Sequence, residues 1–248
     1  MESIGYLAAG VAHEIRNPLA QMQMASDGLA KLDAVHENES ASMLSELMSD
    51  AIERADAVVR RLMDFSASAK LVLKPGDLNQ LVEDTLEIMS YDIENADVEL
   101  TRELSDSLDP IRFAAEELQQ ILINIIVNAL QAMGNAGGRL AVRTESRVIE
   151  GLPPDEGARS GNRLRNGDEV YCIEVKDSGP GIPSSHMNSL FDAFFTSKPT
   201  GKGTGLGLTI AKKVVDLHGG LIEVDNRSNQ TGARVRISLP TGDVMTSV

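Results

Sequence analysis

The stretch EELQQILINIIVNALQAM, residues 116–133, predicts a long helix with one apolar face. Two asparagines, Asn124 and Asn128, stand one turn apart on another face of this helix. Each costs roughly a few tenths of a kcal/mol relative to alanine, and a buried amide needs a hydrogen-bond partner. The pair therefore either makes an ordinary hydrogen bond in the core or binds Mg²⁺ and phosphates, and the spacing leaves both interpretations open. The apolar face consists of Leu118, Ile121, Leu122, Ile125, Ala129 and Met133.

The pattern around this helix mixes strands with helices. It predicts an α+β fold, an α/β sandwich in which helices cover one face of a mixed sheet. We expect two further helices in this part of the chain, over residues 79–95 and 205–218. The segment 150–167 is rich in glycine, proline, arginine and asparagine, which indicates a hairpin loop, and we assign it no function. The expected strands are residues 70–76, 98–104, 111–113, 139–148, 170–177, 221–225 and 233–239.

Residues 3–72 contain two apolar stripes at helical spacing, separated by a polar turn. Two helices with one apolar face each form an N-terminal helical hairpin that cannot bury itself, and a dimeric four-helix bundle is the usual solution. The alternative is that both helices pack onto the rest of the same chain. Pro75 and Gly76 mark a break, so we expect domains over 1–72 and 73–248. The stripes are Ile4, Leu7, Val11, Ile15, Leu19 and Met22, then Leu44, Leu47, Met48, Ala51, Ala55, Val58, Leu62 and Phe65.

The composition excludes several classes of function and location. With 248 residues and a formal net charge of −14, the chain is a poor candidate for binding nucleic acid or an anionic membrane. Its single cysteine, Cys172, permits no disulfide within the chain and fits a reducing compartment. No apolar run approaches the length of a membrane span, and the N-terminus lacks the pattern of a signal peptide. We expect a cytoplasmic protein, or the cytoplasmic part of a larger or membrane-attached sensor.

His13 lies on the first expected helix and points away from its apolar stripe. An imidazole is a good phosphoryl acceptor, because one ring nitrogen has a free lone pair near neutral pH. Glu14 beside it could take the proton from the other ring nitrogen. The alternative is an exposed histidine without a role, which a lone His-Glu pair would favour. A metalloprotease site is excluded, because the His-Glu-x-x-His motif needs a histidine where Asn17 stands. The other histidines, expected at the surface or at helix ends, are His36, His186 and His218.

Asp177 ends an expected strand, on the apolar side of that strand. A carboxylate in this position is costly unless a donor binds it, and the exocyclic amine of adenine would serve. Gly179 and Gly181 follow it in DSGPGIP, residues 177–183, and would let the backbone pass close to a base. The alternative is an ordinary strand-ending Asp-Ser-Gly turn. The apolar residues on the same side of the strand are Tyr171, Ile173 and Val175.

Four alternating glycines run through GKGTGLG, residues 201–207, into an expected helix. Exposed amides and the helix dipole favour anions at a helix N-terminus, and Lys198 and Lys202 could contact phosphate oxygens. Neither a P-loop nor a Rossmann fingerprint is present. Three phenylalanines precede the glycines and form the hinge of a lid, a small satellite core, or both. They are Phe191, Phe194 and Phe195.

Four segments follow one another in the chain: HEIRNP at 13–18, NIIVNA at 124–129, DSGPGIP at 177–183 and GKGTGLG at 201–207. With the phenylalanine-rich stretch, they resemble the H-box, N-box, glycine boxes and F-box of the two-component sensor histidine kinases. The resemblance is to the catalytic core of that family and covers nearly the full chain. One departure is Ala114, where many relatives carry an acidic residue, and its absence puts a helix cap in doubt.

The resemblance implies an ATP-dependent protein histidine kinase, with a dimerisation and phosphoacceptor hairpin followed by a Bergerat-type ATP-binding domain of the GHKL class. It implies that His13 is autophosphorylated with Glu14 as acid–base helper, and that the phosphoryl group passes to an aspartate of a response regulator. It also implies that Asn17 helps to dephosphorylate the regulator, that Asn128 is the main magnesium ligand beside Asn124, and that the protein is a homodimer. The residues implied to bind ATP are Asn124, Asn128, Asp177 (which reads adenine), Gly179, Gly181, Lys198, Lys202, Gly203, Thr204, Gly205, Leu206 and Gly207.

Two other classes of function stay open. A GHKL ATPase of another class, a chaperone- or topoisomerase-like engine, would explain the nucleotide motifs but not the H-box. It predicts steady ATP turnover without a phosphoenzyme. A non-catalytic dimeric scaffold that binds ATP as a regulatory ligand predicts nucleotide binding with neither turnover nor phosphoprotein.

Overall fold

The computed structural model describes residues 19–20, 22–29, 41–49, 51–52, 55, 71–151, 164–198, 205–227 and 231–242 of the chain. The chain divides into two compact units, residues 1–70 and 71–248. The domain ranges expected from the sequence, 1–72 and 73–248, stay predictions. No helix within the described ranges combines the length and the apolar character needed to cross a membrane.

In the first unit, residues 22–29 and 41–49 are helical. The described members of the two predicted stripes, Leu19, Met22, Leu44, Leu47, Met48, Ala51 and Ala55, are all helical, and the other members lie outside the described residues. The hydroxyl oxygens of Ser26 and Ser49 lie 2.9 Å apart and share a hydrogen bond between the two segments. Ser26 is fully buried, whereas many large apolar side chains of the unit are exposed. The described part of the hairpin therefore leaves apolar surface uncovered. The exposed side chains are Met22, Met24, Leu29, Met43, Leu44, Leu47 and Met48.

The second unit contains two sheets. The strands are β1 (Lys74–Gly76), β2 (Val98–Glu103), β3 (Ile111–Phe113), β4 (Gly138–Val148), β5 (Glu169–Asp177), β6 (Leu221–Asn226) and β7 (Ala233–Pro240). The main sheet has the order β2-β4-β5-β7-β6, so β2 and β6 are its edge strands. Strand β2 runs parallel to β4, and the other neighbours are antiparallel. The small second sheet pairs β1 with β3.

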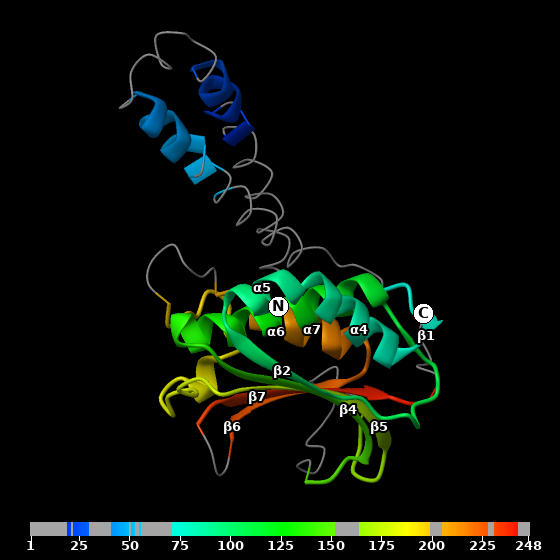
Figure 1. Ribbon diagram of the computed structural model, residues 1–248. Coiled ribbons are helices and arrows are strands. Elements are labelled where there is room, and N and C mark those ends of the chain that lie inside the picture. The colour runs from blue at the N-terminus through cyan, green and yellow to red at the C-terminus, as the bar shows by residue number, and fades with distance from the viewer. Residues whose placement is uncertain are drawn as a thin grey trace. The chain divides into compact units, whose positions relative to one another are not determined.

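The helices form a layer on one face of the main sheet (Figure 1). They are α4 (Leu78–Ile88), α5 (Ser90–Asn95), α6 (Ala115–Met133) and α7 (Gly207–Leu217), with short 3₁₀ turns η1 (Gly134–Ala136) and η2 (Met187–Ser189). All six residues of the apolar face predicted for residues 116–133 are buried. The predicted α+β sandwich with helices on one face of a mixed sheet is therefore confirmed.

The single helix predicted over 79–95 is wrong, because the chain forms α4 and α5 with a break at Met89. At this break the hydroxyl of Ser90 donates a hydrogen bond of 2.7 Å to the carbonyl of Glu87. A serine that bonds to the backbone in this way competes with the hydrogen bonds of a helix. The Met89 side chain is buried, so the apolar spacing runs through the break and does not reveal it.

Two other elements begin later than expected. Strand β1 begins at Lys74 rather than at residue 70, and α7 begins at Gly207 rather than at residue 205. Gly205 has a φ of +66°, outside the helical region of backbone conformation, so the helix cannot include it. The segment 150–167 connects the antiparallel strands β4 and β5, as the hairpin prediction requires, and part of it lies outside the described residues.

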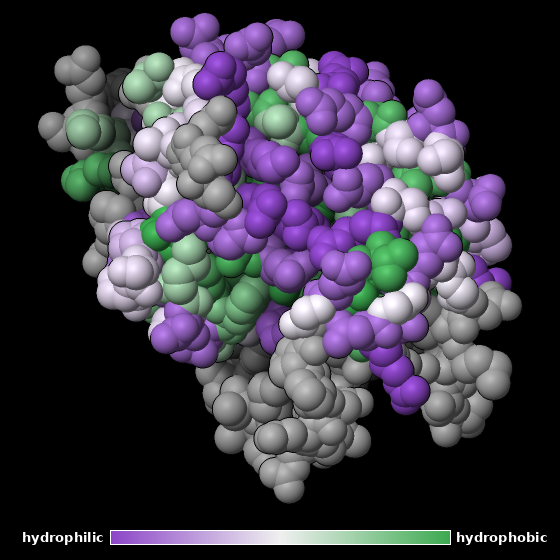
Figure 2. All heavy atoms as spheres, turned by 90° about the horizontal axis from the view of Figure 1, so that it is seen from below, coloured by the Kyte–Doolittle hydropathy of each residue, from purple (hydrophilic) through white to green (hydrophobic). Residues whose placement is uncertain are grey.

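The open face of the main sheet carries a network of ion pairs, and Figure 2 shows hydrophilic side chains gathered on this face. Glu174 on the central strand β5 is only 3% exposed. It accepts a hydrogen bond of 2.7 Å from Arg236 and pairs with Lys176. Burial raises the pKa of this carboxyl, but the hydrogen bonds from Lys176 and Arg236 outweigh burial and hold the pKa below its usual value. Arg236 in turn pairs with Glu223 of β6 at 3.6 Å.

His218 is the C-cap residue of α7, so its predicted position at a helix end is confirmed, and its side chain is buried, only 1% exposed. Its Nε2 accepts a hydrogen bond of 2.9 Å from the backbone N–H of Ala114, at the start of α6. Its Nδ1 lies 2.8 Å from the carbonyl oxygen of Val214. This pattern requires a neutral ring with the proton on Nδ1. Ala114 provides no side-chain cap for α6, and His218 instead binds the N–H of that residue.

We predict that stability falls at acidic pH because of His218. Burial lowers the pKa of His218 below its usual value of 6.5, so the unfolded chain binds this proton more readily than the folded one. Stability is therefore fully present above about pH 6.5 and is lost as the pH falls towards the lower folded-state pKa. Urea unfolding of the wild type and of His218→Gln, between pH 8 and pH 5.5, should give a clearly smaller pH dependence for the variant. Equal slopes in the two proteins would contradict this assignment.

Candidate functional site

Asp177 stands at the end of β5 and is buried, with the residue 7% exposed. Its Oδ1 accepts hydrogen bonds from the backbone N–H of Gly179 at 2.8 Å and of Ala233 at 3.2 Å. The apolar residues predicted to share its side of the strand are all buried in the main core. Within the described part of the chain, Oδ2 of Asp177 has no hydrogen-bond donor. A ligand with an N–H group could therefore bind Oδ2 without displacing a contact of the protein.

The connection between β6 and β7 holds Asp177 in place, which the sequence analysis missed. Arg227 donates a hydrogen bond of 3.2 Å to the backbone carbonyl of Asp177, and its own N–H donates to the carbonyl of Gly232 at 3.1 Å. Gly232 has a φ of +119°, and a Cβ added there would overlap the Asp177 carbonyl oxygen. Only glycine fits this position without a shift of the backbone. Arg227 and Gly232 therefore both pack directly against the backbone at the end of β5.

The two glycines predicted after Asp177 are both closely packed. A Cβ on Gly179 would lie 3.0 Å from Asp177 Oδ1 and 3.4 Å from the backbone of Ala132 in α6. Gly181 has a φ of +81°, and its Cβ would lie 2.8 Å from Asn226 Oδ1. These contacts place the loop after Asp177 beside the C-terminal end of α6. The glycines therefore serve the packing of this loop, whatever ligand it meets.

Asn226 is a further residue that the sequence analysis missed. Its Oδ1 accepts a hydrogen bond from the N–H of Ile182 at 2.7 Å, and its Nδ2 donates to the carbonyl of Ile182 at 2.8 Å. One amide side chain thus satisfies both backbone groups of Ile182, as a neighbouring strand would. The only signal in the sequence was an asparagine at the end of a strand, which carries no information about its partner.

Asn124 and Asn128 lie on α6 and are both half-buried. Asn124 faces the start of α7, because a Cβ on Gly207 would lie 2.8 Å from Asn124 Oδ1. The oxygen of Asn128 accepts a hydrogen bond of 2.7 Å from Nζ of Lys198. The same ammonium group also contacts Oε1 of Gln131. The face of α6 that carries Asn124 and Asn128 is therefore bordered by the N-terminus of α7 and by Lys198.

Phe194 and Gly205 are joined by a backbone hydrogen bond of 3.0 Å from Phe194 N–H to the Gly205 carbonyl. Both residues have positive φ, +67° and +66°, and this conformation is rare for a bulky side chain. The Phe194 side chain is exposed, so it does not belong to the predicted satellite core. Phe191 instead packs against the main core, and the ring of Phe195 meets that of His186 edge-on at 5.3 Å.

Around the C-terminal half of α6, the structure thus brings together the end of β5, the start of α7 and Lys198. Several predicted site residues lie outside the described part of the chain. They are His13, Glu14, Asn17, Lys202, Gly203 and Thr204. The predicted residues Gly205, Leu206 and Gly207 lie at the start of α7, where Leu206 is fully buried.

Two family models match the chain. Residues 114–243 match the histidine kinase-, DNA gyrase B- and HSP90-like ATPases. Residues 3–69 match the His Kinase A phospho-acceptor domain. Together these matches account for both units.

Curated relatives resemble nearly the whole chain. The sensor histidine kinase ZraS of Escherichia coli O157:H7 is 34% identical over 240 residues, which is 96% of this chain and 46% of that protein. The signal transduction histidine-protein kinase AtoS of Escherichia coli K12 is 32% identical, over 97% of this chain and 35% of that protein. The chain therefore spans less than half the length of these relatives.

Solved structures share the fold. The catalytic domain of histidine kinase ThkA, in a nucleotide-free form, is 26% identical, with a TM-score of 0.54, over 69% of this chain and 97% of that one. Full-length ShkA in complex with AMPPNP is 22% identical, with a TM-score of 0.72, over 96% of this chain and 46% of that one.

We predict that Gly232→Ala destabilises the protein by more than a positive φ alone explains. An alanine with positive φ costs about 1–3 kcal/mol, and at this position its Cβ also overlaps the carbonyl of Asp177. Gly151→Ala is the matched control, because Gly151 has a φ of +76° with nothing within 4 Å of an added Cβ. Urea unfolding should show a larger loss of unfolding free energy for Gly232→Ala. Equal losses would mean that the Asp177 carbonyl does not limit the space at Gly232.

Proposed function

The chain belongs to the histidine kinase family, and from this we propose that it transfers the γ-phosphoryl group of ATP to its own His13 and then to a response regulator. The observation that carries the proposal is the order of the two matched domains in one chain. His13 falls within the phospho-acceptor match and Asp177 within the ATPase match. An ATPase of another class would need no phospho-acceptor domain.

The nucleotide site of this proposal lies between α6, the end of β5 and the start of α7. Oδ2 of Asp177 accepts a hydrogen bond from the exocyclic amine of adenine, while Oδ1 stays on the amides of Gly179 and Ala233. The negative charge of the phosphates is favoured at the N-terminus of α7, whose first amide groups have no partner within the helix. The residues we assign to the phosphates and their loop are Asn124, Asn128, Lys198, Lys202, Gly203, Thr204, Gly205, Leu206 and Gly207.

The donor atoms on α6 suit Mg²⁺, which prefers oxygen ligands. Asn128 presents its amide oxygen to a cation already, since it accepts a hydrogen bond from the ammonium group of Lys198. We assign Asn128 as the main magnesium ligand and Asn124 as a second residue of this region. When bound, the metal would neutralise charge on the β- and γ-phosphate oxygens. A formal net charge of −14 makes such local positive charge necessary for binding a polyanion.

The reaction is an in-line displacement at the γ-phosphorus. A ring nitrogen of His13 donates its lone pair, so an N–P bond forms while the bond from phosphorus to the bridging oxygen of ADP breaks. Glu14 accepts the proton from the other ring nitrogen, and the product is a phosphoramidate. The protein contributes mainly by positioning the reacting groups and by stabilising charge. Because His13 and the nucleotide site belong to different units, the segment near residues 70–76 must act as a hinge.

We further propose that an aspartate of a response regulator receives the phosphoryl group from His13, and that Asn17 positions water when the phosphorylated regulator is hydrolysed. The histidine kinase ThkA has been solved in complex with the response regulator protein TrrA, and that structure covers 96% of this chain at 22% identity, with a TM-score of 0.62. Since the chain spans less than half the length of its curated relatives, we propose that it acts as the cytoplasmic catalytic part of a larger sensor.

A homodimer follows from the exposed apolar face of the hairpin. Leu44, Leu47 and Met48 belong to the second predicted stripe, and all three side chains are exposed. A second copy of the hairpin would cover them in a four-helix bundle. This arrangement would remove these three apolar side chains from water.

We predict that Leu47→Lys weakens dimerisation at least about tenfold, because each protomer would lose a buried leucine and gain a buried charge. Sedimentation equilibrium of the whole chain measures the dissociation constant directly. Glu46→Lys places the same lysine at a neighbouring exposed polar position and should leave the constant unchanged. An unchanged dissociation constant for Leu47→Lys would exclude this face from the dimer interface.

The decisive test of the proposed function is incubation of the wild type and His13→Gln with γ-labelled ATP and Mg²⁺. The wild type should become labelled, with the label lost in acid and kept in base, as expected of an N–P bond. The His13→Gln variant should show no label while its ATP affinity stays within about twofold, since the nucleotide site lies on the other unit.

His36→Gln is the matched control, because it removes another histidine of the same unit and should keep full labelling. Label retained on His13→Gln would refute the assignment of His13. Steady phosphate release without any labelled protein would instead identify an ATPase of another class. Nucleotide binding with neither label nor release would identify a scaffold.

A further inference from the structure

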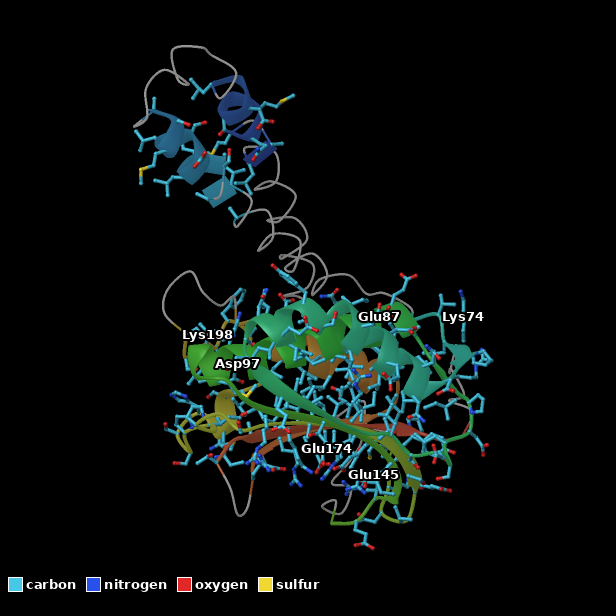
Figure 3. The ribbon with its side chains drawn as sticks, in the orientation of Figure 1. Lys74, Glu87, Asp97, Glu145, Glu174 and Lys198 are labelled. Atoms are coloured by element: carbon cyan, nitrogen blue, oxygen red, sulfur yellow. The ribbon has the colours of Figure 1, made fainter. Side chains whose placement is uncertain are left out.

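Lys198 reaches from the segment after η2 to the C-terminal half of α6 (Figure 3). Its Nζ donates a hydrogen bond of 2.7 Å to Oδ1 of Asn128 and a second one to Oε1 of Gln131. Asn128 and Gln131 are three residues apart on α6, so their side chains lie on the same face of the helix. The two amide oxygens thus converge on one ammonium group, although the chain positions of lysine and asparagine differ by 70 residues.

This arrangement is a binding site for a cation. An ammonium group has three N–H donors and no acceptor, so it seeks the same oxygen atoms that a divalent metal ion seeks. In the proposed function, Asn128 gives its oxygen to Mg²⁺. Two cations beside one amide oxygen would repel each other at close range. Lys198 and Mg²⁺ are therefore competitors for Asn128.

Gln131 has no other role in the site as described so far. Its side chain is exposed, and among the described residues its only hydrogen bond is the one from Lys198. Holding a long lysine side chain in one conformation is entropically unfavourable, and a second acceptor helps to keep the ammonium group at Asn128. The sequence analysis gave Gln131 no function, because a glutamine on an exposed helix face is unremarkable by itself.

We propose that Lys198 takes the place of the metal ion at Asn128 whenever Mg²⁺ is absent, and that Gln131 is the positioning residue that holds it there. This inference rests on the proposed function, since it concerns the same nucleotide site. Arrival of Mg²⁺ with the nucleotide displaces the ammonium group from the Asn128 oxygen. The phosphate side of the site consequently carries a cation both with and without Mg²⁺. A nucleotide that binds without the metal is therefore still next to one positive charge, the ammonium group of Lys198.

The competition has a measurable consequence. If Lys198 supplies the cation at Asn128 only when the metal does not, its loss weakens binding of metal-free nucleotide far more than binding of the magnesium complex. The coupling between Lys198 and Mg²⁺ is then negative, and linkage requires that each lowers the benefit of the other. A lysine that simply contacted a phosphate would instead contribute to binding with and without metal.

The test is calorimetric titration of the full chain with ADP, once in EDTA and once with excess Mg²⁺, for wild type and Lys198→Met. We expect Lys198→Met to bind ADP about tenfold more weakly in EDTA but only about two- to threefold more weakly with Mg²⁺. The factor by which Mg²⁺ strengthens binding should therefore be several times larger in the variant. The same factor in both proteins, including an equal loss under the two conditions, would overturn the proposal.

Two further variants make the result specific. Gln131→Leu changes an exposed helix position, leaves Asn128 and Lys198 in place, and should weaken ADP binding in EDTA several-fold with little effect in Mg²⁺. An unchanged affinity in EDTA would remove Gln131 from the proposal.

Lys74→Met removes the same charge from an exposed position of strand β1 and should bind ADP as the wild type does under both conditions. If wild type binds no ADP with or without Mg²⁺, the proposed nucleotide site itself fails, which is a different outcome from equal magnesium factors.

Discussion

The burial of one face of α6 against the sheet is the constraint on which the second unit depends. Leu118, Leu122 and Ile126 are among the largest fully buried side chains of the chain as described. Full burial of such a side chain contributes about 1.5–3 kcal/mol, so this face alone fixes the helix firmly on the sheet. The orientation leaves Asn124 and Asn128 on the remaining face of the helix. The same packing that stabilises the fold therefore presents the amide groups that the site needs.

The buried imidazole of His218 extends this constraint to α7. It binds the amide of Ala114 at the start of α6, while its other nitrogen contacts the last turn of its own helix. The contact ties the N-terminus of α6 to the C-terminus of α7. At the opposite end of α7, Gly207 packs against Asn124. Helix α7 is thus attached to α6 at both ends, which positions its N-terminus, the proposed phosphate-binding end, relative to the asparagines.

Patterns with a short period were enough to predict much of the fold. The apolar face of α6 follows from a spacing of three and four residues, and the inward side of β5 up to Asp177 follows from alternation. Contacts between distant segments were not predictable in this way. Asn226 and Ile182 are 44 residues apart in the sequence, and Lys198 and Asn128 are 70 residues apart. The sequence around an asparagine or a lysine does not indicate which distant residue it will bind. The burial of His218 was missed for the same reason, because its partner Ala114 offers only a backbone amide. The break at Met89 coincides with a hydrogen bond from the Ser90 hydroxyl to the carbonyl of Glu87, and a periodic apolar pattern does not reveal such a bond.

The open sheet of the second unit also has a consequence for the solubility of the chain. An open sheet has two edge strands, and unpaired backbone groups on such strands invite pairing with another molecule. In this protein both edges carry charge: Glu99 and Glu103 on β2, and Glu223 and Asp225 on β6. A second copy that added its own edge strand to the same edge would bring like carboxylates close together. The acidic edges therefore oppose strand-by-strand aggregation, and this protection should weaken at high salt, which screens the charges.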